Sequence, residues 1–406
     1  VGFLSLWLDE YMHVTPAINF LNGGSFLQDD NNGLILTFLD IITFKIFGIS
    51  EFTARIWSVI FGAGSILLTY YLTNKLFNNK YLSVIVSILV TFSLYHIFWS
   101  RIGRNYACFG FSYLIALISF FNAIEKQPQK KDKLYEKYSI NSKWLFIFII
   151  AIIYSLFNHM LTVFIVFSIG FYMSTIALTN MIRGDKKSFY DKYAIIFYLF
   201  LIFIIFFFTP LVKLTILPFL LKILPERSIG WFIPDWGYII EKIKSADRFK
   251  SFNVYYDVLS NDYMYLYISG LIGFILSFIL NRKGGIFLIS FFVIPFLILS
   301  FIFREPYLSH YLFFIYPIFL IAIGCGLYFI VELICNIILK KKYPTIFKFV
   351  YIIVIIIIFI NTPKKEIKDL LTTTEHGQVV KKELFNSTFV NWRTPCEKLK
   401  QLIKED

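Results

Sequence analysis

Charged residues are scarce in this chain. Only 16% of its 406 residues are Asp, Glu, Lys or Arg, whereas 58% are hydrophobic and 49 are phenylalanine. Soluble domains carry about 25% charged residues, so the composition excludes a soluble globular fold. It predicts an all-α polytopic membrane protein.

Cysteine is also rare, with four residues in the whole chain. Three of them, Cys108, Cys325 and Cys335, lie inside apolar segments, and Cys396 stands alone near the C-terminus. No disulfide framework or zinc site can be assembled from this spacing.

Several motifs are missing as well. The chain has no Walker A loop, no dinucleotide fingerprint and no G-x-S-x-G, so ATP-driven transport and serine hydrolysis have no support. Internal repeats of the kind found in many secondary transporters are not evident either.

Long apolar segments dominate what is present. A helix needs roughly 17 to 25 residues to cross a bilayer, and ten segments of about this length are separated by charged, Asn, Pro or Gly clusters. They cover residues 52–73, 81–99, 105–124, 143–158, 160–182, 193–212, 263–280, 285–303, 310–339 and 345–361.

The cations in the short loops predict the orientation, because cytoplasmic loops are enriched in Lys and Arg. One set of alternating loops carries Lys75, Lys80, Lys126, Lys130, Lys131, Lys133, Lys137, Lys143, Arg183, Lys186, Lys187, Lys192, Arg282, Lys283, Lys340, Lys341 and Lys342. The opposing short loops carry Arg101, Arg104 and Arg304. We therefore place residues 1–51 outside the cytoplasm. The net charge of +13 reflects this topology and contact with anionic lipid, and we expect no nucleic-acid partner.

Three regions follow from these segments. Residues 1–51 are expected to contain the end of a first helix, over Val1–Leu8, and an outer catalytic loop. Residues 52–361 form the transmembrane bundle, with an outer loop over 213–262, and residues 362–406 begin an outer domain. We expect both ends to be cut, with an eleventh helix missing at the N-terminus.

Polar side chains gather in the loops of the outer face. Asp9 and Glu10 open the first loop, with His13 one turn further along a predicted surface helix over Tyr11–Leu21. The segment Gly33–Phe47 is too short and too interrupted for a span, which favours an interfacial helix. The other outer loops carry Arg101, Arg104, Tyr106, His159, Arg304, His310 and Tyr311.

Carboxylates and arginines on one membrane face indicate chemistry on a phosphate-bearing lipid. A carboxylate removes a proton from an acceptor. Arginines stabilise a departing phosphate, since a guanidinium donates parallel hydrogen bonds to its oxygens.

The same residues resemble the C-type polytopic glycosyltransferases, in the branch of protein O-mannosyltransferases and lipid A aminoarabinose transferases. The resemblance is spread over most of the chain. It rests on Leu6-Trp7-Leu8-Asp9-Glu10, Gly48-Ile49-Ser50-Glu51 with Ala54-Arg55, Arg104-Asn105-Tyr106-Ala107, Tyr154–His159, His310-Tyr311-Leu312 with Pro317, and Asn391-Trp392-Arg393. The family pattern has arginine where this chain has His310.

The resemblance implies that one sugar is transferred, with inversion, from a polyprenyl-phosphate carrier to an acceptor on the outer face. Asp9 is then the catalytic base, and Glu10 orients the acceptor or, with Asp9, holds a divalent cation. Arg101, Arg104, Tyr106, Arg304, His310 and Tyr311 form the donor-phosphate site, and His13 and His159 are possible substrate contacts. The implied location is the cytoplasmic membrane of a prokaryote, with the active site extracytoplasmic and membrane lipids as further partners.

Other interpretations of these residues stay open. Asp9 and Glu10 also suit the cap of an interfacial helix, Arg101 and Arg104 suit lipid anchors, and the histidines suit packing roles. A flippase or exporter of lipid-linked sugars, or a polymerase or ligase of lipid-linked glycans, is the alternative function. An exporter predicts charge in the middle of several spans, whereas the ionisable residues here gather at one face.

Overall fold

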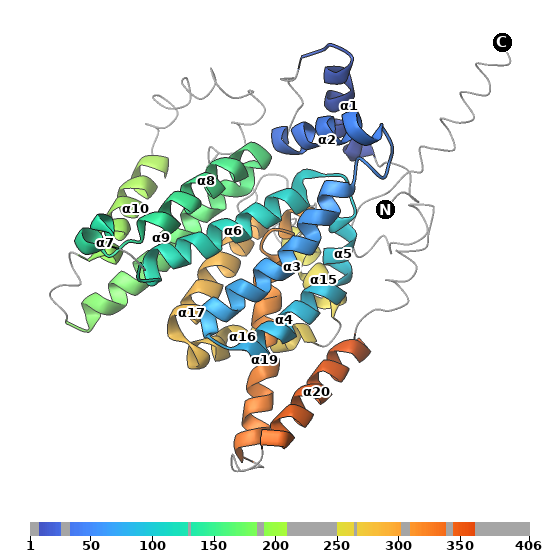
Figure 1. The fold of residues 1–406 in the computed structure, drawn as a ribbon. Helices are drawn as coiled ribbons and strands as arrows, with labels where there is room; N and C mark the ends of the chain where they lie inside the picture. Colours follow the sequence, from blue (N-terminus) through green and yellow to red (C-terminus); the bar gives the residue numbers. More distant parts are fainter. Residues whose placement is uncertain are drawn as a thin grey trace, which may run out of the picture.

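The computed structural model describes residues 8–25, 33–128, 131–184, 191–208, 250–263, 266–301, 309–337 and 344–361. All regular structure in these ranges is helical (Figure 1). The first half contains α1 (Leu8–Leu21), α2 (Leu34–Phe47), α3 (Ile56–Phe77), α4 (Lys80–Phe92), α5 (Leu94–Ser100), α6 (Asn105–Glu125), α7 (Lys133–Tyr138), α8 (Ser142–Asn158), η1 (Met160–Thr162), α9 (Val163–Ile182) and α10 (Lys192–Phe208). The second half contains α15 (Lys250–Asp262), α16 (Leu266–Leu280), α17 (Arg282–Leu288), η4 (Ile289–Val293), α18 (Ile294–Phe301), η5 (Ser309–Leu312), α19 (Tyr316–Ile337) and α20 (Pro344–Asn361).

The predicted all-α membrane fold is confirmed, and the described part of each of the ten apolar segments is formed by one helix or by two or three consecutive helices. In the described ranges, however, five helices are long and apolar enough to cross a membrane, or six if α4 and α5 count as one span. The remaining segments give shorter helices. At 1.5 Å per residue, the 15 residues of α16 reach about 22 Å, which is less than the roughly 30 Å of bilayer hydrocarbon.

The first two helices lie together at one end of the bundle (Figure 1). Both were predicted at the interface, and α2 begins and ends within one residue of its predicted range. They share a small apolar core with the residue that precedes Arg55, made of Val14, Ala17, Ile41, Phe44 and Ala54. A cluster of five residues is too small to fix α1 and α2 against the bundle by itself, so polar contacts to the bundle are needed as well.

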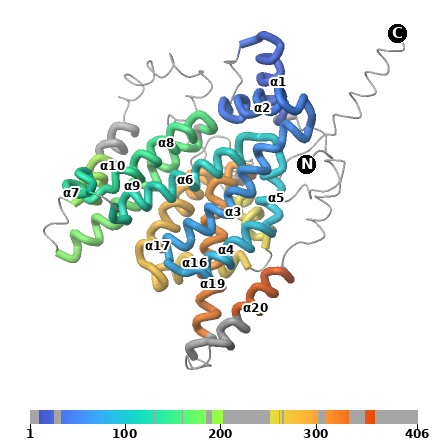
Figure 2. The backbone as a smooth tube through the Cα atoms, in the orientation of Figure 1, coloured from blue at the N-terminus to red at the C-terminus, as the bar shows by residue number. Residues whose placement is uncertain are grey.

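The sixth helix runs through the middle of the molecule. It packs against α3 and α8, and its side chains are buried along nearly its whole length. Figure 2 follows its path from the end of α5 toward α7. Its 21 residues correspond to about 30 Å, so the two ends of α6 lie at the two faces of the predicted membrane.

A sharp break separates α4 from α5, whose axes differ by 61°. Ser93 sits at the break, where its Oγ accepts a hydrogen bond from the His96 N–H at 3.0 Å and donates one to Oδ2 of Asp262 at 2.6 Å. Oδ1 of Asp262 accepts from the Tyr95 N–H at 3.0 Å. A helix leaves its first N–H groups unpaired; here the buried carboxylate accepts from Tyr95 directly, and it orients the Ser93 hydroxyl that accepts from His96.

That carboxylate comes from α15. Residues 213–249 of the predicted outer loop lie outside the described residues, and 250–262 form this helix, which packs against α18 and η5. Residues 1–7 and 362–406, predicted as the end of a first helix and the start of an outer domain, also lie outside the described residues.

Among the described helices, α16 and α19 pack with their backbones in close approach. A Cβ at Gly273 would lie 1.8 Å from the Ala322 carbonyl oxygen, and one at Gly326 would lie 2.3 Å from that of Ser269. Because both neighbours are backbone atoms, no rotamer change relieves the contact. Small residues at helix contacts are typical of membrane proteins.

We expect Gly273→Val to separate α16 from α19 and to lower the free energy of unfolding by at least the roughly 1–3 kcal/mol typical of overpacking. Thermal melting of the purified chain in detergent measures the change. Gly64→Ala is the control, because its Cβ meets only the end of the Phe111 side chain, which can rotate. Equal melting temperatures for wild type and Gly273→Val would contradict this packing.

Candidate active site

The turn between α5 and α6, residues 101–104, is held in place by a carboxylate from α1. The Gly103 N–H donates to Oε1 of Glu10 at 2.6 Å. A Cβ at Gly103 would lie 2.8 Å from the Ala54 carbonyl oxygen and 3.0 Å from Glu10 Oε1. Glycine therefore allows the turn to approach both α1 and the start of α3.

Glu10 also forms a buried ion pair with Arg55. The Arg55 guanidinium donates from Nε to Oε1 at 2.8 Å and from Nη2 to Oε2 at 2.7 Å. The two side chains are 1% and 0% exposed. A bidentate pair of this kind is both strong and directional. Since both carboxylate oxygens accept hydrogen bonds inside the protein, the geometry supports a positioning role for Glu10.

Arg104 and Tyr106 form the centre of the site at the start of α6. Arg104 Nη2 donates to the Tyr106 hydroxyl at 2.8 Å, and the guanidinium carbon lies 5.0 Å from the centre of the Tyr106 ring. The Arg104 side chain is half-buried. The positive end of the α6 dipole lies at the same place, so this end of α6 attracts anions.

Rings from η5 complete this surface. His310 stacks on Tyr106 with 4.4 Å between ring centres, and it meets Trp99 edge-on at 5.2 Å. The ring centre of Tyr311 lies 4.5 Å from that of His310. Sequence positions about 200 residues apart are therefore packed side by side, as the outer-loop placement of these residues predicted.

His159 lies on the opposite side of Tyr106. Its ring centre is 5.8 Å from that of Tyr106 and 6.2 Å from that of Tyr311. Its Nδ1 accepts a hydrogen bond from the Leu161 N–H at 3.1 Å, which requires an unprotonated Nδ1. This imidazole is therefore neutral, with its proton on Nε2.

The histidines are neutral for a common reason. Burial, followed by the positive charge of Arg104, lowers the pKa of His13 to about 3 and the pKa of His159 to about 3. His310 is buried beside the same guanidinium, and a charged imidazole is unfavourable there. The positive charge of the site thus comes from arginine.

The structure gathers most of the residues that the sequence predicted. Arg104, Tyr106, His13, His159, His310 and Tyr311 lie in one group, and Glu10 lies beside it. Arg101 is half-buried at the same turn, where burial and then the nearby Arg55 lower its pKa. The side chain of Asp9 and the whole of Arg304 lie outside the described residues.

Sequence reasoning missed Asp40, which appeared only as an interruption in an apolar segment. Its side chain is 0% exposed, and no hydrogen-bond partner of either carboxyl oxygen is found in the described ranges. Burial, then the charge of Glu10, raises the pKa of Asp40 well above its usual value. The signal was available in α2, where Asp40 is the one acid among 14 largely apolar residues.

The predicted divalent-ion site rests on Asp9 and Glu10, and the side chain of Asp9 lies outside the described residues. No group of three or more His, Cys, Asp or Glu residues in these ranges is arranged to hold a metal ion. The oxygens of Glu10 already accept hydrogen bonds from Arg55 and Gly103.

Comparison with known proteins gives a structural match. Neither a protein-family model nor a curated protein sequence matches the chain. The crystal structure of ArnT from Cupriavidus metallidurans in the apo state matches with a TM-score of 0.51 and 10% identity, covering 92% of this chain and 69% of ArnT. The chain has the ArnT fold.

A second structure, of ArnT from the same organism bound to undecaprenyl phosphate, matches with a TM-score of 0.49 and 11% identity over 92% of this chain and 70% of ArnT. ArnT is a C-type polytopic membrane glycosyltransferase. The match to the apo structure confirms the resemblance drawn from the motifs for the fold.

Removing Glu10 from this ArnT-like chain is expected to destabilise it. Glu10→Ala leaves the Arg55 guanidinium buried without its carboxylate, which typically costs about 3–5 kcal/mol of unfolding free energy. Thermal melting in detergent measures the loss. Glu136→Ala, an exposed acid in α7, is the matched control and should change little. Similar losses in the two variants would contradict the role of the ion pair.

Stability should also fall in acid. An unfolded histidine binds a proton below pH about 6.5, whereas folded His159 does so only near pH 3. The contribution of His159 is therefore complete above pH 6.5 and is lost as the pH falls from 6.5 toward 3. By pH 5 the loss is about 2 kcal/mol.

His159→Asn keeps an acceptor near the Leu161 N–H and removes the titrating ring. We expect the melting temperature of this variant to change less between pH 7 and pH 5 than that of wild type. Phe157→Leu, at a nearby exposed position, should keep the wild-type dependence. An unchanged pH dependence in His159→Asn would show that another group is responsible.

Proposed function

We propose that this protein is a membrane glycosyltransferase that moves one sugar from a polyprenyl-phosphate donor to an acceptor, with inversion at the anomeric carbon. The observation that carries the proposal is the convergence of Arg104, Tyr106, His159 and His310, from three separate segments, at one end of α6. The ArnT fold supports the general class of enzyme.

Arg104 is the proposed contact for the donor phosphate. Its guanidinium is half-buried and its direction is set by the hydrogen bond to Tyr106. The neighbouring histidines His13 and His159 are neutral, so the positive charge offered to the phosphate here comes from the guanidinium of Arg104. Arg101 lies at the other end of the same turn and adds a second guanidinium. Two arginines at a turn suit a phosphate that gains negative charge as it leaves.

The transfer step needs a base on the acceptor side. The acceptor oxygen forms a bond to the anomeric carbon while the bond from that carbon to the phosphate oxygen breaks. The electron pair of the broken bond leaves with the phosphate, and the proton of the acceptor hydroxyl passes to the Asp9 carboxylate. Attack from the face opposite the leaving phosphate inverts the anomeric carbon.

The remaining residues position these groups. Glu10 accepts hydrogen bonds from Arg55 and from the Gly103 N–H, which fixes the backbone at the neighbouring residue, Asp9. Tyr106, His310 and Tyr311 form a ring surface beside Arg104, and His13 and His159 border it as contacts for the substrate. We place this site on the extracytoplasmic face of a prokaryotic cytoplasmic membrane, because the loops at this end carry few lysines.

Transfer can be measured with the full chain in membranes supplied with labelled polyprenyl-phosphate sugars. Asp9→Asn removes the base and should reduce transfer by about 10²- to 10⁴-fold. Arg104→Ala should also reduce it, with partial recovery in Arg104→Lys, which keeps the charge but loses the parallel donors.

Asp132→Asn is the matched control. Asp132 caps α7 by accepting from Leu134 and Tyr135, and asparagine caps helices equally well, so full transfer is expected. Label that crosses the bilayer while still attached to lipid, with Asp9→Asn unchanged, would instead identify an exporter. Transfer only of long glycans would identify a polymerase or ligase.

A further inference from the structure

A second polar site lies at the other end of α6, away from the candidate active site. It is a cavity of about 540 Å³ formed by the ends of α6, α7, α10 and α17. Among its lining residues are Glu125, Lys137, Tyr138, Lys192, Tyr193 and Lys283. The length of α6 places this cavity about 30 Å from Tyr106, on the face that the loop cations predict to be cytoplasmic.

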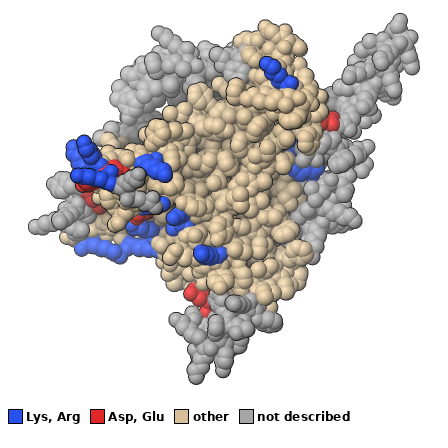
Figure 3. All heavy atoms as spheres, in the orientation of Figure 1, with Lys and Arg blue, Asp and Glu red and all other residues tan. Residues whose placement is uncertain are grey.

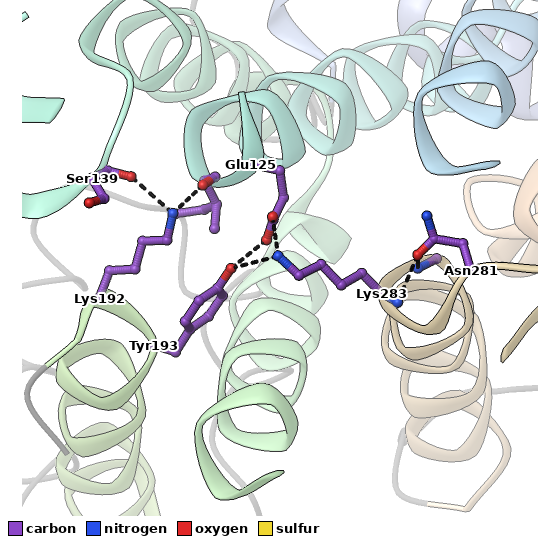
Figure 4. A network of polar contacts seen from close by, with 8 residues as sticks. Glu125, Ser139, Lys192, Tyr193, Asn281 and Lys283 are labelled. Carbon is purple, nitrogen blue, oxygen red and sulfur yellow. Dashed lines mark hydrogen bonds and ion pairs between the residues drawn. The ribbon is translucent and has the colours of Figure 1, made fainter. Parts of the chain in front are cut away.

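A hydrogen-bond network forms part of the cavity wall (Figure 4). Glu125 pairs with Lys283, and the Tyr193 hydroxyl donates to Oε1 of Glu125 at 2.6 Å. Lys283 Nζ also donates to the Tyr193 hydroxyl at 3.3 Å. These contacts join α6, α10 and α17, so the wall is fixed before any ligand binds.

Lys192 is held by backbone groups in the same network. Its ammonium group donates to the carbonyl oxygens of Ile124 and Ser139, the second at 2.9 Å. Figure 4 shows it between the end of α6 and the residue that follows α7. The charge of Lys192 is therefore fixed at the edge of the cavity by two neutral acceptors.

The lining has more positive than negative charge. It contains the lysines Lys137, Lys192 and Lys283 and the carboxylates Glu125 and Asp191. Glu125 pairs with Lys283, and Asp191 accepts from the Tyr193 and Ala194 N–H groups, each at 2.9 Å. The carboxylates are thus engaged within the wall. Lys and Arg side chains gather around this end of the molecule (Figure 3).

An apolar strip leads out of the cavity along α10. Ile195 lines the cavity and is 43% exposed, and Leu199, one turn further along the helix, is 59% exposed. Residues four apart lie on the same helix face. A cationic cavity that continues into an exposed apolar strip matches a molecule with an anionic head and a hydrocarbon tail.

We propose that this cavity binds the phosphate headgroup of an anionic membrane phospholipid, with an acyl chain along Ile195 and Leu199. Lys137 and Lys192 both line the cavity and supply ammonium groups for the phosphate, whereas Lys283 is paired with Glu125 in the cavity wall. The bound lipid then links α10 to α6, α7 and α17 at the cytoplasmic face. This binding is separate from sugar transfer at the opposite face.

Native mass spectrometry of the full chain in detergent tests the proposal. Phosphatidylglycerol and phosphatidylcholine with the same acyl chains are offered in competition, and wild type should retain phosphatidylglycerol preferentially. One lysine near a lipid phosphate typically changes affinity by about fivefold. Lys137→Gln should weaken phosphatidylglycerol binding by about this factor, and Lys137→Arg should restore it.

Lys75→Gln is the matched control, since Lys75 lies at the same predicted face and, like Lys137, stands over a tyrosine ring. Equal effects of Lys75→Gln and Lys137→Gln would show general surface attraction and would overturn the site. Inorganic phosphate and glycerol phosphate are also tested as competitors. Displacement of the lipid by either one at equal concentration would assign the cavity to a free phosphate compound and would overturn the lipid assignment.

Discussion

The candidate active site depends on the buried pair of Glu10 and Arg55. The two residues are 45 positions apart in the chain, and with Gly103 they join α1, the start of α3 and the turn before α6. The apolar core shared by α1 and α2 is small, so this ionic contact helps to link the first loop to the bundle. A buried pair of this kind adds little net stability compared with apolar residues, but it fixes which groups meet. Here it fixes the chain beside Asp9.

The central helix α6 relates the two polar ends of the molecule. Arg104 and Tyr106 lie at its start, and Glu125 is its last residue. Because α6 is buried along its length, a tilt or axial shift at one end moves the groups at the other. The two ends differ in chemistry: arginine and neutral histidines surround the first, whereas lysines and paired carboxylates surround the second. This difference fits the proposals of sugar transfer at the first end and lipid binding at the second.

Hydropathy located the helices because the length of an apolar segment is a local property of the sequence. The clustering of Arg104, His159 and His310 followed from loop alternation, which places them all at one face. The sequence did not predict which side chains form pairs. Arg55, the partner of Glu10, lies 45 positions away in the chain, and the burial of Asp40 depends on how α2 packs. The break at Ser93 lies inside an uninterrupted apolar segment, so hydropathy alone predicts one continuous span there.

That break has a consequence for the order in which the chain is assembled in the membrane. At the start of α5, Asp262 accepts from the Tyr95 N–H and from the Ser93 hydroxyl, and it is synthesised 169 residues after Ser93. Unpaired backbone groups at membrane depth are costly. While only the first half of the chain has been inserted, α4 and α5 therefore favour a single straight helix, whose internal hydrogen bonds are complete. We therefore expect the bend to become stable only after α15 has been synthesised, and the turn bearing Arg101 and Arg104 to reach its final position late in biogenesis.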